Sequence, residues 1–124
     1  MLLPTFCRVL TSTMSLALLG SALGAQSALG AFDSQTDIGQ TRRSGSASYD
    51  PQRQAYLVAG SGQNMWNDRD DFHFVWKRMT GNFILSTRAS FIGVGADPHR
   101  KIGWSIRPTL ATNGPHVTAA LHGD

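Results

Sequence analysis

Apolar and polar residues alternate along four segments in the second half of this 124-residue chain: 72–77, 83–91, 101–107 and 116–122. The apolar series are Phe72, Phe74 and Trp76, then Phe83, Leu85 and Phe91, then Ile102, Trp104 and Ile106, and finally Val117, Ala119 and Leu121. Successive side chains of a β-strand point to opposite faces, so a two-residue period predicts strands, whereas a helix would repeat at three and four residues. The pattern therefore predicts an antiparallel sheet with an apolar inner face and a polar outer face.

Shorter signals earlier in the chain predict a hairpin. Residues 45–49 and 55–59 fit two short strands, and residues 50–53 between them read Asp-Pro-Gln-Arg. Asp and Pro at the first two positions favour a type I turn. Short strands separated by connections that contain glycine and proline are typical of an all-β sandwich or jelly roll.

The N-terminus has the features of a secretory signal peptide. Arg8 precedes a mostly apolar run at residues 9–24, and small residues near its end suit a signal peptidase. Ser and Thr dilute the run, which is shorter than the roughly 20 apolar residues of a membrane span, so we favour cleavage over a retained anchor. Cys7 is the only cysteine and lies in this leader. The exported chain would therefore have no disulfide, thiolate metal site or cysteine nucleophile.

The chain after the signal peptide at residues 1–25 divides into two parts. Residues 26–44 are polar or small apart from Leu29, Phe32 and Ile38. We expect an irregular lead-in that Phe32 and Ile38 attach to the domain. Residues 45–124 hold the predicted strands and form the β domain, and the chain length allows no more than one.

Composition argues against several function classes. The formal net charge of +3 is too small for the clustered basic surface of a nucleic-acid-binding protein. Glycoside hydrolysis needs two carboxyl groups across a cleft, and the sequence has no Glu and no Asp within the four alternating segments. The Gly-x-Ser-x-Gly turn of serine hydrolases is also missing. We therefore predict a protein that is not an enzyme and has no catalytic residues.

Several motifs together resemble one protein family. They are Ser-Gly-Gln-Asn-Met-Trp at 61–66, Asp-Phe-His-Phe-Val-Trp-Lys at 71–77, Gly-Asn-Phe at 81–83, Asp-Pro-His-Arg-Lys-Ile-Gly-Trp at 97–104, His-Val at 116–117 and His-Gly-Asp at 122–124. This set resembles the concanavalin-A-like jelly-roll domain at the N-terminus of some exported bacterial proteins. In many of these the domain precedes a β-propeller like that of the periplasmic Tol component, often described as a biopolymer transporter. The resemblance implies a concanavalin-like antiparallel β-sandwich.

The resemblance also implies that the domain is incomplete. Related domains continue well past the His-Gly-Asp motif and supply the remaining strands of both sheets, so residues 45–124 would form the N-terminal half of a jelly roll. Such a half would expose strand edges and aromatic side chains. We favour a truncated gene or a fragment, and the alternative is a complete, compact variant.

The polar face of the predicted sheet is the candidate ligand-binding surface. Its side chains are His73, Lys77, Arg88, Lys101, Ser105, Arg107, His116 and His122, with Trp66 at the rim. Such a face could hydrogen-bond to hydroxyl groups while Trp66 stacks on a sugar ring, and the alternative is an ordinary solvated face. Trp76 and Trp104 are assigned to the core, because they share the apolar side.

Metal binding is the weaker interpretation of the polar residues. The possible ligands for zinc, copper or iron are His73, His99, His116, His122, Asp97 and Asp124, and none of them forms a closely spaced pair like that of a helical zinc site. The Asn and Asp residues at 64–71 could ligate calcium, but we favour a solvated loop. We predict no metal and no other cofactor.

These features together predict an exported, non-catalytic module of the bacterial cell envelope, periplasmic or secreted, that binds a glycan or an envelope protein. It would bind no nucleic acid and would keep no membrane span after signal cleavage. The alternative function is that of a polysaccharide-acting hydrolase, whose catalytic carboxylates would lie in a missing C-terminal half.

We expect the chain, expressed with its own leader in a Gram-negative host, to appear in the periplasm shortened by about 22 to 30 residues. Mass spectrometry of the periplasmic fraction measures this directly. Recovery of the full-length chain from the membrane fraction would contradict the signal-peptide prediction.

Overall fold

The computed structural model describes residues 28–66 and 68–123, and the predicted signal peptide lies outside them. The described residues form six strands: β1 (Ser34–Ile38), β2 (Ser46–Asp50), β3 (Ala55–Ala59), β4 (Phe72–Trp76), β5 (Lys101–Ile106) and β6 (Val117–His122). Turns and loops connect the strands, and this part of the chain contains no helix. A helix that could cross a membrane is therefore not found among the described residues.

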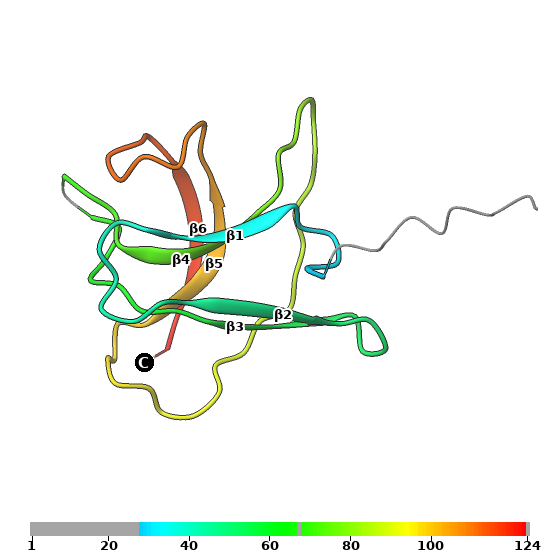
Figure 1. Ribbon diagram of the computed structural model, residues 1–124, viewed down its shortest axis with the longest axis horizontal. Coiled ribbons are helices and arrows are strands. Elements are labelled where there is room, and N and C mark those ends of the chain that lie inside the picture. Colours follow the sequence, from blue (N-terminus) through cyan, green and yellow to red (C-terminus); the bar gives the residue numbers. More distant parts are fainter. Residues whose placement is uncertain (1–27, 67, 124) are drawn as a thin grey trace, which may run out of the picture.

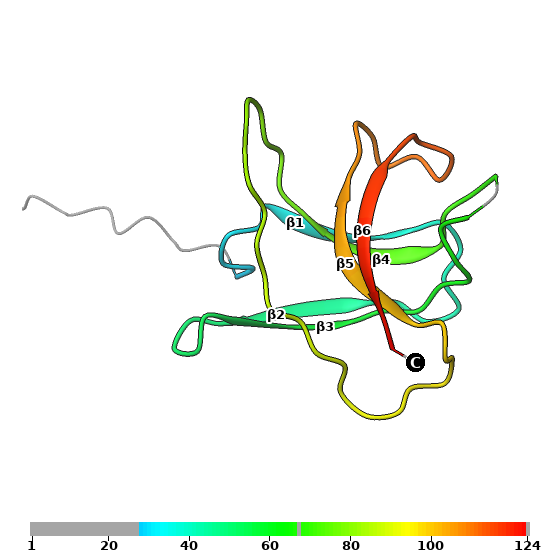
Figure 2. The same ribbon diagram turned by 180° about the vertical axis from the view of Figure 1, so that it is seen from behind.

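The strands pair two by two into three antiparallel sheets: β1 with β4, β2 with β3, and β5 with β6. In Figure 1, β1–β4 and β2–β3 run side by side and the β5–β6 hairpin crosses behind them, whereas Figure 2, seen from behind, has this hairpin in front. The predicted all-β, antiparallel class is confirmed. The crossing of one hairpin over the other two pairs is compatible with a β-sandwich.

The turn between β2 and β3 forms as its sequence predicts. The Asp50 carboxylate accepts hydrogen bonds from the backbone N–H groups of Gln52, at 2.9 Å, and Arg53, at 3.1 Å. The bonds from Arg53 foremost hold the pKa of Asp50 below its ordinary value. Pro51 suits the second position because its φ is already fixed near the value that the turn requires. Gln54 ends the turn with a φ of 50°.

The lead-in expected to be irregular contains β1. The sequence of β1, Ser-Gln-Thr-Asp-Ile, has no apolar alternation, so its strand conformation depends on pairing with β4, in which Ile38 lies opposite Phe72. The expected anchoring role of Phe32 and Ile38 is confirmed. Ile38 is 2% exposed and is the only fully buried apolar side chain among the described residues, and the Phe32 ring contacts Tyr56 at 5.0 Å.

The segment at 83–91 is not a strand, although its alternation predicts one. It runs through an extended loop and pairs with no other strand of the described chain. The alternation survives only in part: Leu85 and Phe91 are half-buried and Ile84 is 95% exposed, but Phe83, expected on the inner side, is 37% exposed. The prediction was wrong because periodicity gives the faces of a segment but does not supply a neighbour to pair with.

Strand β4 keeps the predicted alternation, but both of its faces are covered. Phe72 and Phe74 share one face, with ring centroids 5.8 Å apart. His73 lies on the other face, which we expected to be solvated, and its side chain is only 4% exposed. A single sheet would have left this face open, but the β2–β3 hairpin packs against it. Trp76 is half-buried and Lys77 is exposed, as predicted.

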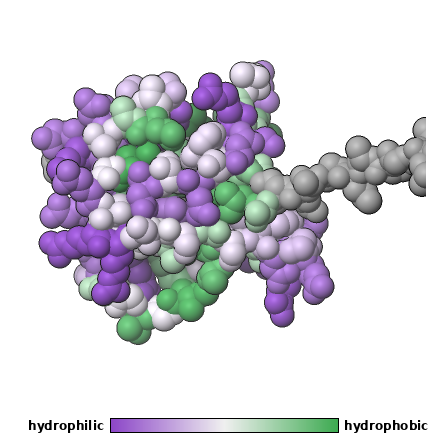
Figure 3. All heavy atoms as spheres, in the orientation of Figure 1, coloured by the Kyte–Doolittle hydropathy of each residue, from purple (hydrophilic) through white to green (hydrophobic). Residues whose placement is uncertain are grey.

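The β5–β6 hairpin departs from its predicted sidedness. Ile106, Val117 and Leu121, expected inside, are 50%, 73% and 54% exposed. Arg107, expected in solvent, has a side chain that is 1% exposed. The hairpin crosses the other pairs instead of joining their sheets, so only part of its apolar face is covered, and Trp104 is half-buried. Figure 3 shows green apolar atoms at the surface among the purple polar ones.

An aromatic cluster joins the three strand pairs. Tyr49 of β2 and Tyr56 of β3 lie opposite each other, with ring centroids 4.6 Å apart. The Phe32 ring contacts Tyr56 edge-on at 5.0 Å and Trp104 of β5 at 6.4 Å. The backbone N–H of Ala31 also donates to the Tyr56 hydroxyl at 2.7 Å. Edge-on and tilted geometries of this kind are favourable for aromatic rings and stabilise contacts between elements far apart in the sequence.

His73 fits between two glycines of the β2–β3 hairpin. A Cβ atom added to Gly45, just before β2, would overlap the His73 ring, and one added to Gly60, just after β3, would lie 2.8 Å from the His73 Cβ. Hydrogen is therefore the only side chain that lets the two backbones approach β4 this closely. The close approach holds the β2–β3 hairpin against the β1–β4 pair.

We expect Gly45→Ala to lower the free energy of unfolding by about 1–3 kcal/mol, because the added methyl group forces His73 out of its position. Urea unfolding followed by tryptophan fluorescence measures the loss. The control uses the double variant Gly45→Ala/His73→Ala. When His73 is already replaced by alanine, Gly45→Ala should lower the free energy of unfolding by less than it does in the wild type. An equal cost in both backgrounds would contradict the proposed packing.

Candidate functional site

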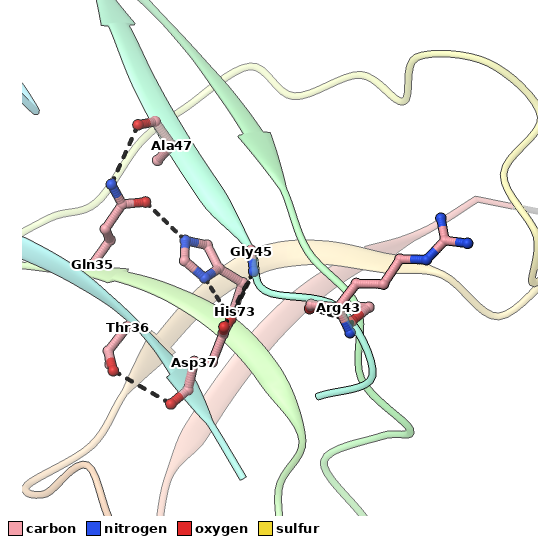
Figure 4. A network of polar contacts seen from close by, with 8 residues as sticks. Gln35, Thr36, Asp37, Arg43, Gly45, Ala47 and His73 are labelled. Atoms are coloured by element: carbon pink, nitrogen blue, oxygen red, sulfur yellow. Dashed lines mark hydrogen bonds and ion pairs between the residues drawn. The ribbon is translucent and has the colours of Figure 1, made fainter. Parts of the chain in front are cut away.

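His73 is the centre of a polar network between β1, β4 and the start of β2 (Figure 4). Its Nδ1 lies 2.8 Å from Oδ1 of Asp37, and its Nε2 lies 3.0 Å from Oε1 of Gln35. The backbone N–H of Gly45 donates to both carboxylate oxygens of Asp37, at 3.1 and 3.2 Å. The Gln35 amide nitrogen donates to the Ala47 carbonyl at 3.4 Å. Two side chains of β1 thus bond directly to the backbone at the start of the next pair, and His73 of β4 bonds to both of them.

The hydrogen bonds of this network stabilise the ionised form of Asp37. The hydrogen bond from His73 foremost, with help from the Gly45 N–H, holds the pKa of the Asp37 carboxyl below its ordinary value of 3.8. Both ring nitrogens of His73 lie within hydrogen-bond distance of a side-chain oxygen of β1. Because both nitrogens are engaged, neither is directed at a substrate. We interpret the network as structural, although a His–Asp pair also occurs in catalytic triads.

A second polar cluster attaches the β5–β6 hairpin to the segment before β4. The guanidinium of Arg107 lies 3.1 Å from a carboxylate oxygen of Asp70, which is 4% exposed. Arg107 also donates to the carbonyls of Thr109, at 2.8 Å, and Ala111, and its guanidinium stacks over the Phe72 ring at 5.5 Å. Nδ1 of His116 lies 3.7 Å from the same Asp70 oxygen. Arg107 is therefore a packing residue whose charge is met inside the fold.

A polar groove lies along the segment between β3 and β4. It consists of two adjoining hollows of about 360 and 280 Å³ that share Gln63, Arg69 and Asp71. The other residues that line the first hollow are Gln40, Arg42, Ser61, Gly62 and Asp97. The other residues that line the second are Asn64, Trp66 and Asp68. Trp66 is 58% exposed at this end, so the groove combines amides, charged groups and one open aromatic face.

Asp71 organises the wall of this groove. Its side chain is 4% exposed and accepts hydrogen bonds from the Gln40 backbone N–H, at 2.8 Å, and from Arg69, at 3.1 Å. Its own N–H donates to the Asn64 carbonyl at 2.7 Å. The backbone of Gly62 packs directly on that of Asp71, and any Cβ there would overlap it. The groove is therefore a built feature of the fold.

Sequence reasoning missed this groove because residues 64–71 were interpreted as a solvated loop. One signal could have found it. Asp70 and Asp71 immediately precede the apolar strand β4, and a carboxylate that such a strand carries into the fold must be paired. Both are in fact buried, Asp70 against Arg107 and Asp71 against Arg69. Asn67 lies outside the described residues.

The predicted binding residues do not share one face, because β4, β5 and β6 do not form one sheet. His73 is buried in its network, and Lys77 and Arg88 are exposed on loops. Lys101 and His122 are cross-strand partners at one end of β5–β6, whereas Arg107 and His116 meet Asp70 near the other end, and Ser105 bonds to Thr118 between them. Trp66 alone borders the groove.

The possible metal ligands are equally dispersed. His99 and His122 approach each other, with ring centroids 6.5 Å apart, and Asp97 lines the groove. The described residues contain no group of three or more His, Cys, Asp or Glu side chains that could hold a metal ion. Asp124 lies outside them.

Comparison with models of protein families, with curated proteins and with solved structures found no match for this chain. The resemblance to the concanavalin-like domain therefore stays a prediction from the sequence motifs.

We expect acid to destabilise the wild-type protein more than the Asp37→Asn variant. The pKa of Asp37 is lowered in the folded chain, so its ionised form stabilises the fold above the ordinary value of 3.8, and this contribution is lost as the pH falls through the lowered value. Asparagine has no charge to lose, so the variant should be weaker at neutral pH and lose less on acidification. Urea midpoints between about pH 6 and pH 3 measure the difference.

The matched control is Asp68→Asn, which removes a carboxylate that is exposed. It should follow the wild-type acid profile. An Asp37→Asn profile parallel to the wild type would contradict the stabilising role of the Asp37–His73 pair.

Proposed function

We propose that this chain is an exported, non-catalytic β-sandwich module of the bacterial cell envelope that binds glycans in the groove beside Trp66. The observation that carries the proposal is an exposed indole at the end of a polar hollow. Sugar rings offer apolar C–H faces and a rim of hydroxyls, so a site that combines an aromatic face with dense hydrogen-bonding groups suits them.

The lining of the groove supports a ligand with many hydroxyl groups. Gln40 and Gln63 contribute amides, which both donate and accept, and Arg42 contributes a guanidinium. Arg69 and Asp71 are partly neutralised by their mutual ion pair at 3.1 Å. A mixed lining of this kind favours a neutral polar ligand over a strongly charged one.

The place of the groove in the sequence supports the same assignment. Four of its residues, Ser61, Gly62, Gln63 and Asn64, together with Trp66, belong to the Ser-Gly-Gln-Asn-Met-Trp motif that resembles the concanavalin-like family. The leader at residues 1–25 supports export to the periplasm or beyond. We further propose that the fold is a jelly roll of this family and that the domain normally accompanies a Tol-like β-propeller.

We expect Trp66→Ala to weaken glycan binding about tenfold, because loss of the indole removes the stacking surface. Isothermal titration calorimetry with the best-bound oligosaccharide from an array of cello-, chito- and peptidoglycan fragments measures the change. The matched control is Leu121→Ala, which truncates another exposed apolar side chain, on β6. It should bind as the wild type does.

Two results would contradict the proposal. One is an array on which the wild-type protein binds no glycan, and the other is equal affinity of Trp66→Ala and the wild type. Release of reducing sugar from a bound oligosaccharide would favour the hydrolase alternative instead.

A further inference from the structure

Residues 83–92 form a strand-like segment with an unpaired backbone. The segment lies between Gly81 and Gly93, which have φ values of 81° and 69°, and no residue within it has a positive φ. Within the described chain, its backbone N–H and C=O groups make no hydrogen bond to another backbone group. In Figures 1 and 2 it is the yellow-green stretch that descends along the molecule from the upper loop to the lower one. We call these ten residues the open segment.

The open segment has one covered side and one free side. Leu85, Ala89 and Phe91 are half-buried, and the Arg100 guanidinium stacks over the Phe91 ring at 4.8 Å. On the free side, Ile84 is 95% exposed and Ile92 is 81% exposed. Isoleucine favours paired strands and is costly to leave in water. A strand edge can pair with another strand when its backbone is extended and its hydrogen-bonding groups are free. Exposed β-branched side chains favour this pairing.

The sequence of the open segment is nearly symmetric for antiparallel pairing with itself. Phe83-Ile84 begins it and Phe91-Ile92 ends it. In the register centred on Arg88, Ile84 lies opposite Ile92 of the second copy, and Leu85 lies opposite Phe91 of the second copy. Ser86 then faces Ser90, and Thr87 faces Ala89. Apolar residues meet apolar ones and small polar residues meet small ones on both faces, as stable cross-strand pairs require.

We propose that the occupant of this edge is the open segment of a second copy, so that the protein forms a symmetric dimer through two antiparallel strands. A two-fold axis through Arg88 makes each apolar pair occur twice and satisfies the free backbone groups along about 30 Å of strand. The dimer is independent of the proposed glycan groove, since no residue of the open segment lines that groove.

The axis leaves one unfavourable contact. Arg88 is exposed, and in this register it faces Arg88 of the second copy directly. Like charges directly opposite each other destabilise a strand pair. The dimer should therefore be reversible and should tighten when this charge is removed or when its sign is changed on one copy only.

Sedimentation velocity of the purified protein over a hundredfold range of concentration tests the dimer. We expect a monomer–dimer equilibrium in the wild type and a monomer for Ile84→Asp, because the new carboxylate would be buried against Ile92 of the second copy. The matched control, Val117→Asp, introduces the same charge at a 73% exposed apolar position on β6 and should leave the dimer unchanged. Ile84 is exposed within one copy, so the variant keeps its fold, which circular dichroism checks.

The charge at Arg88 tests the register separately. Arg88→Ser should dimerise several-fold more tightly than the wild type, and an equimolar mixture of wild type and Arg88→Asp should form a heterodimer tighter than either homodimer. A wild-type protein that stays monomeric throughout would overturn the proposal. So would a dimer that Val117→Asp dissociates and Ile84→Asp does not, or a mixture with no preference for the heterodimer.

Discussion

The contact between His73 and the β2–β3 hairpin is the interaction on which the rest of the structure depends. Gly45 and Gly60 bring their backbones against the imidazole, and Asp37 and Gln35 bond to both of its nitrogens and to the backbone of β2. One side chain of β4 thereby fixes the position of two strand pairs. Every member has a partner, which is what makes a polar group at such a position stabilising.

Polar contacts are important for holding the strand pairs together because few apolar side chains are fully buried. Ile38 is the only fully buried apolar side chain among the described residues, and the other large apolar side chains are half-buried or exposed. Burial of this extent provides limited hydrophobic stabilisation in a small domain. The aromatic cluster around Tyr56 and the Arg107–Asp70 pair supply further connections between the strand pairs.

The groove follows from the same construction. Asp70 and Asp71 are adjacent, and the first meets Arg107 of the β5–β6 hairpin while the second meets Arg69 and the backbone of Gln40. The segment that enters β4 is thus held from two sides. Its remaining residues, including the exposed Trp66, line the groove in which we propose that a ligand binds. A site held in place by the fold would lose little conformational entropy on binding.

The sequence by itself determined the features that depend on neighbouring residues. The positions of β4 and β5, the Asp50 turn and the anchoring by Phe32 and Ile38 could all be predicted, because strand periodicity and turn hydrogen bonds act over a few residues. The tertiary structure alone decided the burial of His73, whose partner Asp37 is 36 residues away, and of Arg107, whose partner is Asp70. It also made β1 a strand and left residues 83–91 without a partner. The physical reason is that a charged or polar side chain is buried only where a distant group meets its charge, and a strand exists only where a second strand accepts its hydrogen bonds.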